Sequence, residues 1–127
     1  MEMFTIIVKL IGAAILAMLV HEGSHYLIAR VYKRKISFRL EIARLFKIIP
    51  IPRGIWDMPM DITSNAQRNI ALAGFTGEFI VVLLLFLINI TTTSFAPYYG
   101  AVAILHFFLY GSYAGEHSDF KWIINKK

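Results

Sequence analysis

Three long apolar segments dominate this chain of 127 residues, at about 4–29, 70–90 and 96–115. A helix of about 20 mainly apolar residues crosses the hydrocarbon core of a bilayer, so each segment is long enough to span it. The composition agrees, with 57% hydrophobic and 17% charged residues. The first segment lacks the cationic start of a secretory signal, and we expect it to be retained. The sequence therefore predicts an all-α integral membrane protein, with three transmembrane helices in a single domain.

The basic residues are distributed unevenly around these segments. Of the 13 Lys and Arg, all but Lys9 lie either in the stretch 30–69 or in the tail 116–127. The loop between the second and third segments has none. Because basic loops stay in the cytoplasm, the N-terminus is expected outside and the C-terminus inside. The net charge of +5 then matches an anionic lipid surface, and no nucleic-acid partner is expected.

The stretch 30–69 is too short to form a core of its own. Within it, "ISFRLEI" (36–42) alternates between apolar and polar residues, which is typical of a strand. The following "KIIPIPRGIW" contains Pro50, Pro52 and Gly54, which favour a turn or an irregular edge over a helix. We expect a small β-hairpin on the cytoplasmic side, between the first and second helices.

The first apolar segment contains "HEGSH", with His21, Glu22 and His25. Each charged group at this depth costs about 2.5 kcal/mol or more on insertion scales. In a helix, residues four apart share a face, so both imidazoles can reach one point. This H-E-x-x-H pattern is that of two zinc ligands and a general base. The alternative is a pair of structural histidines, hydrogen-bonded to neighbouring helices.

A catalytic zinc usually takes three protein ligands, and this chain has no cysteine to supply one. The first and third helices are expected to run in the same direction. Glu116, His117 and Asp119 should therefore lie at the depth of the histidine pair. Glu78, inside the second apolar segment, is a further candidate, either as the third ligand, as the partner of a histidine nitrogen, or as a group that holds substrate.

At these motifs the chain resembles the site-2 protease family of intramembrane zinc metalloproteases. "HEGSH" looks like the metal motif of the family. "ALAGFTGEF" (71–79) is similar to its Ala-Gly-Pro-x-x-Asn stretch, with Gly74, Phe75 and Glu78 at the Gly, Pro and Asn positions. "HSDF" (117–120) is similar to the family's Asp-Gly motif, with Asp119 at the metal-binding position. The chain departs from the family pattern at Ser24, Glu78 and Phe120.

The resemblance implies a zinc ion bound by His21, His25 and Asp119, with Glu22 as the general base. It implies hydrolysis of a peptide bond in or near a transmembrane helix of another membrane protein. Glu78, Gly74 and His117 would bind substrate or support the ligands, and Gly74 and Gly77 also suit close helix packing.

His106, in the third segment, is expected to make a polar contact between helices. Two alternatives to the protease remain at this point. One is a membrane protein that binds metal through the same ligands without hydrolysis, and the other is a small membrane interaction subunit. A homo-oligomer is compatible with all three.

Overall fold

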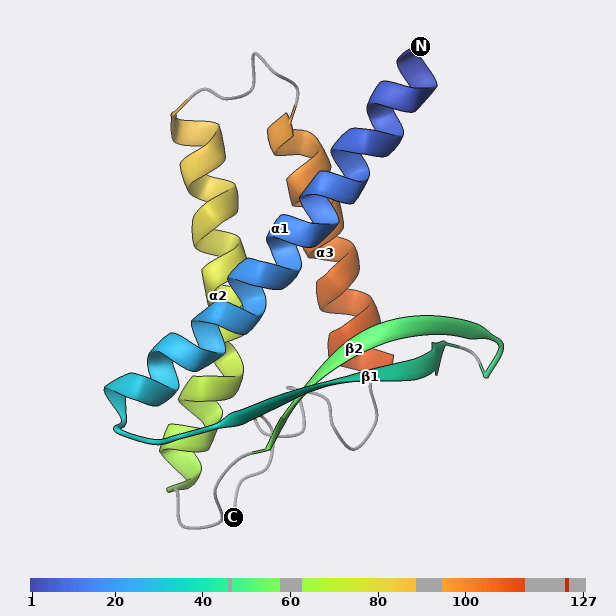
Figure 1. The fold of residues 1–127 in the computed structure, drawn as a ribbon. Helices are drawn as coiled ribbons and strands as arrows, with labels where there is room; N and C mark the ends of the chain where they lie inside the picture. The colour runs from blue at the N-terminus through green and yellow to red at the C-terminus, as the bar shows by residue number, and fades with distance from the viewer. Residues whose placement is uncertain (46, 58–62, 89–94, 114–122, 124–127) are drawn as a thin grey trace.

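The computed structural model describes residues 1–45, 47–57, 63–88, 95–113 and 123 (Figure 1). These form three helices and one strand pair. In chain order the elements are α1 (Glu2–Val31), β1 (Ser37–Leu45), β2 (Ile49–Asp57), α2 (Ser64–Leu87) and α3 (Phe95–Tyr113). The protein is thus mostly helical, with a small strand pair between the first two helices, as predicted.

Helix α1 crosses α2 and α3 obliquely, and all three helices pack against one another (Figure 1). Helices α1 and α3 run in the same general direction, and α2 runs in the opposite direction (Figure 1). The hairpin lies at the end where α1 finishes, α2 begins and α3 finishes (Figure 1). The second half of α1 and the C-terminal end of α3 are therefore on the same side of the bundle.

Helix α1 buries a single narrow stripe, formed by Ala13, Ala17, His21, His25 and Ala29. These residues are spaced four apart, so they follow one face of the helix from turn to turn. The alanines allow close approach of the neighbouring helices, since small side chains let helix backbones pack tightly. The two histidines continue this stripe and are consequently placed inside the bundle.

Helices α1 and α2 are long and apolar enough to cross a membrane, judged by length and composition. The described apolar part of α3, Phe95–Leu109, is shorter. Large apolar side chains cover the outside of the helices, such as Phe4, Leu19 and Leu87 at 73%, 61% and 78% exposure. Soluble monomers rarely expose apolar surface on this scale. These features suggest that the protein associates with a membrane.

The strand β2 differs from the expected turn or irregular edge. It pairs with β1 along its whole length, antiparallel, with Arg44 opposite Pro50 and Ile42 opposite Pro52. The prolines are two residues apart, so both nitrogens face the same edge of the strand. Each strand of a two-stranded sheet has one unpaired edge, where a missing N–H costs no ladder hydrogen bond. The prolines are therefore compatible with a strand.

The apolar face of β1 is exposed to a large extent. Phe38, Leu40 and Ile42 share this face by alternation, and all three are exposed. Ile55, which pairs with Arg39 on the other face, is buried. The hairpin therefore presents an apolar surface on the same side of the bundle as the end of α1.

Candidate metal centre

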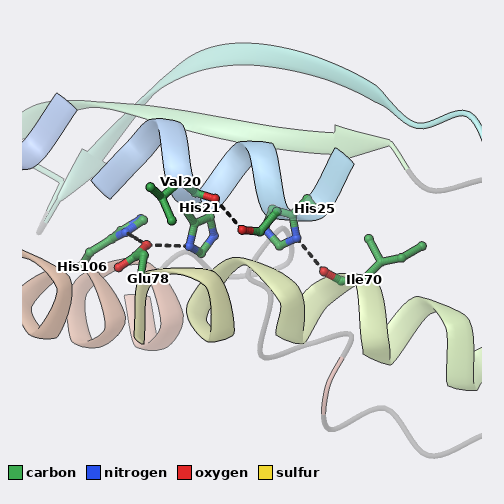
Figure 2. Close-up of polar contacts among 7 residues, drawn as sticks. Val20, His21, His25, Ile70, Glu78 and His106 are labelled. Atoms are coloured by element: carbon green, nitrogen blue, oxygen red, sulfur yellow. Dashed lines mark hydrogen bonds and ion pairs between the residues drawn. The ribbon is translucent and has the colours of Figure 1, made fainter. Parts of the chain in front are cut away.

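His21 and His25 lie one turn apart on α1 and face α2 (Figure 2). Both side chains are buried, at 4% and 1% exposure. Their rings meet edge to face, with centroids 4.6 Å apart and planes inclined by 82°. The i, i+4 spacing of the sequence motif thus brings the two imidazoles together inside the helix bundle.

Each imidazole is held through its Nδ1 atom by an oxygen of α2. His21 Nδ1 lies 2.7 Å from Oε1 of Glu78, and His25 Nδ1 lies 2.6 Å from the carbonyl oxygen of Ile70 (Figure 2). A carbonyl oxygen only accepts, so His25 Nδ1–H is the donor, and the Glu78 carboxylate accepts from His21 in the same way. In a neutral ring the Nε2 atom then carries the lone pair. This is the arrangement that metal-binding histidines usually show.

The two Nε2 atoms both border Gly74 of α2. A Cβ at this glycine would lie 2.6 Å from His21 Nε2 and 2.7 Å from His25 Nε2. The space in front of Gly74 is therefore open only because the residue has no side chain. Two nitrogens converge on it, an arrangement that could hold a metal ion.

Glu78 is buried between α1 and α3, at 2% exposure. Its Oε1 atom lies 2.6 Å from Nδ1 of His106 as well as 2.7 Å from Nδ1 of His21 (Figure 2). The possible ligand atoms of His21, Glu78 and His106 all lie within 4.8 Å of one another. These three residues are therefore a second group that could hold a metal.

Aromatic rings pack beside the histidine pair. Phe75 packs against His21 with ring centroids 4.7 Å apart, and against Phe107 at 5.0 Å. An apolar wall of this kind limits the access of water and strengthens electrostatic interactions beside it.

The structure brings together four residues that the sequence singled out, namely His21, His25, Gly74 and Glu78. Glu22 is half-buried on α1, next to His21 in the chain. Glu116, His117 and Asp119 lie outside the described residues. Helix α3 ends at Tyr113, about two turns beyond His106.

Two participants were not assigned a role at the metal from the sequence. The Ile70 carbonyl had no signal, because a backbone acceptor has no sequence signature. His106 had one, as an ionisable residue in an apolar segment, and the expected contact between helices is present. Its position beside His21, at 4.6 Å between ring centroids, was not anticipated.

No protein-family model, curated protein or solved structure matches this chain.

Proposed function

We propose that the protein is an intramembrane zinc peptidase of the site-2 protease type. The observation that carries this proposal is the pair of imidazoles on α1. Their Nδ1 atoms are held by Glu78 and Ile70, and their Nε2 atoms converge in front of Gly74. In this proposal His21 and His25 bind zinc through Nε2, and Asp119 supplies the third ligand.

We place α1, α2 and α3 across the membrane, with the hairpin and the tail in the cytoplasm. The exposed apolar surface of α1 and α2 supports this placement, because lipid covers such surface at no cost in free energy. The distribution of basic residues supports the orientation. The exposed Phe38, Leu40 and Ile42 suit contact of the hairpin with the lipid interface.

In the proposed mechanism the chain holds the reacting groups and moves one proton. Bound zinc would supply Lewis-acid activation of a water molecule and of the peptide carbonyl. Glu22 would accept a proton from the attacking water and deliver it to the leaving amine. Its place in the motif, about 100° around the helix from His21, puts its carboxylate beside the ligands. Phe75 and Phe107 would keep bulk water from the apolar side.

The substrate would be a transmembrane segment of another membrane protein. Its backbone is internally hydrogen-bonded while helical, so cleavage requires local unwinding near the site. The outer edge of β1 offers backbone groups that can pair with an unwound segment by strand addition.

A Glu22→Gln variant tests the assignment of roles. We expect purified protein to bind one zinc as tightly as wild type, while cleavage of a membrane-protein substrate falls by at least about 100-fold. An Asp119→Ala variant should lose affinity for zinc. Persisting cleavage in Glu22→Gln, or unchanged affinity in Asp119→Ala, contradicts the proposal.

A second candidate is a membrane metal-binding protein without peptidase activity. It is favoured by the group of His21, Glu78 and His106, which could hold a metal without any residue of the tail. The two candidates differ in their need for His25. In the peptidase, His25→Ala abolishes zinc binding, whereas a site formed by the second group keeps its metal in this variant.

A further inference from the structure

We infer that His106 is a positioning residue of the metal centre, which acts on His21 through the shared carboxylate of Glu78. The inference rests on the proposed function, because it takes His21 Nε2 as a zinc ligand. It adds a residue of α3 to a site that otherwise involves α1, α2 and the tail.

The shared oxygen is the first step of the argument. Oε1 of Glu78 receives contacts from two rings on two different helices, His21 at 2.7 Å and His106 at 2.6 Å. Within the described part of the chain, Oε2 of the same carboxylate has no hydrogen-bond partner. The Nδ1 atoms of both rings thus contact the same carboxylate oxygen, Oε1.

A glutamate side chain has three rotatable bonds, so one hydrogen bond leaves its carboxylate free to turn. The second bond, from α3, fixes which oxygen points toward His21. The His21 ring is in turn oriented by that oxygen, and its Nε2 atom borders Gly74. His106 is therefore placed to determine the orientation of His21 without binding the metal itself.

The distances favour this role over coordination of one metal by Glu78 Oε1 together with the Nδ1 atoms of the two rings. Two ligand atoms on one tetrahedral zinc, at about 2.0–2.1 Å from the metal, are about 3.3 Å apart. The N···O distances of 2.6 and 2.7 Å at Glu78 are shorter and lie in the range of charge-assisted hydrogen bonds. The Nδ1 atoms of both rings are thus engaged as donors to Glu78.

The side-by-side packing of the rings supports the same conclusion. His106 and His21 have centroids 4.6 Å apart, with planes inclined by 55°. Loss of the His106 ring therefore removes both the hydrogen bond to Glu78 and a packing surface for His21. These two effects are separable by the choice of substitution.

The experiment measures zinc affinity of the full chain in detergent micelles, by competition with a chromophoric chelator. His106→Leu removes the donor and keeps an apolar side chain, and His106→Asn retains an N–H near the Nδ1 position. Phe108→Leu is the matched control, because it changes an exposed ring of the same helix, outside the candidate site, without removing a donor. His21→Ala is the reference for loss of a ligand.

We expect His106→Leu to weaken zinc binding by about 10- to 100-fold, the range found for groups that orient a ligand. His106→Asn should recover most of this loss, and Phe108→Leu should bind as wild type does. With cobalt in place of zinc, His106→Leu should retain the visible absorption of the wild-type ligand set, because no ligand is exchanged. Recovery in His106→Asn and the retained spectrum distinguish positioning from a general structural defect.

Two results would overturn the inference. One is wild-type affinity in His106→Leu, and the other is a loss as complete as that of His21→Ala, which would make His106 a ligand. If wild-type protein itself binds no zinc, the proposed function fails and this inference fails with it. If zinc binding requires His21 and His25 but His106→Leu binds zinc as tightly as wild type, the inference fails and the proposed function stands.

Discussion

Replacement of Gly74 by alanine is the most direct perturbation of the space between the two imidazoles. The new Cβ would lie 2.5 Å from Cε1 of His21, 2.6 Å from Nε2 of His21 and 2.7 Å from Nε2 of His25. Carbon atoms in contact normally stay about 3.5–4.0 Å apart. One or both rings must therefore move by about 1 Å, away from the point where their nitrogens converge.

The size of the effect follows from the packing of the site. Overpacking of a filled interior costs about 1–3 kcal/mol. If this strain falls on the arrangement that binds metal, zinc affinity decreases by about 5- to 150-fold, since 1.4 kcal/mol corresponds to tenfold. The substitution also raises helix propensity by about 1 kcal/mol, which favours the fold and leaves the ring displacement unchanged.

Gly23→Ala is the matched control, because it lies inside the "HEGSH" motif and its Cβ would meet no atom of the described residues within 4 Å. It brings the same gain in helix propensity on α1, without a steric conflict. Zinc affinity is measured for both variants by chelator competition, with helix content followed by circular dichroism. We expect Gly74→Ala to lose affinity and Gly23→Ala to retain it. Equal affinity in the two variants would refute the convergence of the two Nε2 atoms in front of Gly74.

Three further predictions concern packing, topology and metal. A Cβ at Gly77 would collide with the side chain of Ser24, so Gly77→Ala should lower the thermal unfolding temperature in micelles. Adding Ser24→Gly should restore this temperature. Additive effects of the two substitutions in the double variant would contradict this contact. The chain has no cysteine, so single cysteines introduced at Thr5 and Ser37 report topology directly. An impermeant thiol reagent should label Thr5→Cys in intact cells and Ser37→Cys only after lysis. Labelling of both variants in intact cells would exclude the proposed orientation. The wild-type protein should contain about one zinc per chain, and His21→Ala should contain less. Dialysis against a chelator should abolish cleavage until zinc is returned. Equal zinc content in wild type and His21→Ala would favour structural histidines.

The pattern of the sequence determined the elements of this protein. Apolar runs of the right length predicted the helices, and alternation over 36–42 predicted the strand β1 (Ser37–Leu45). The i, i+4 spacing placed His21 and His25 on one helix face, because the pitch of a helix is fixed by its backbone. The hairpin was predicted, but β2 is a regular strand where a turn or an irregular edge was expected, since Pro50 and Pro52 argue against a central strand but are tolerated at the open edge of a two-stranded sheet.

Only the tertiary structure decided how the imidazoles are held. The hydrogen-bond partners of His21 and His25 are 57 and 45 residues away in the chain, and His106 is 28 residues from Glu78. Periodicity shows which side chains share a helix face, but the residue opposite that face depends on how the helices cross. That crossing is set by the small residues at the contact, where Gly74 lets α2 approach the histidine rings. The orientation of both Nε2 atoms, and hence the candidate metal site, is a property of the packed bundle.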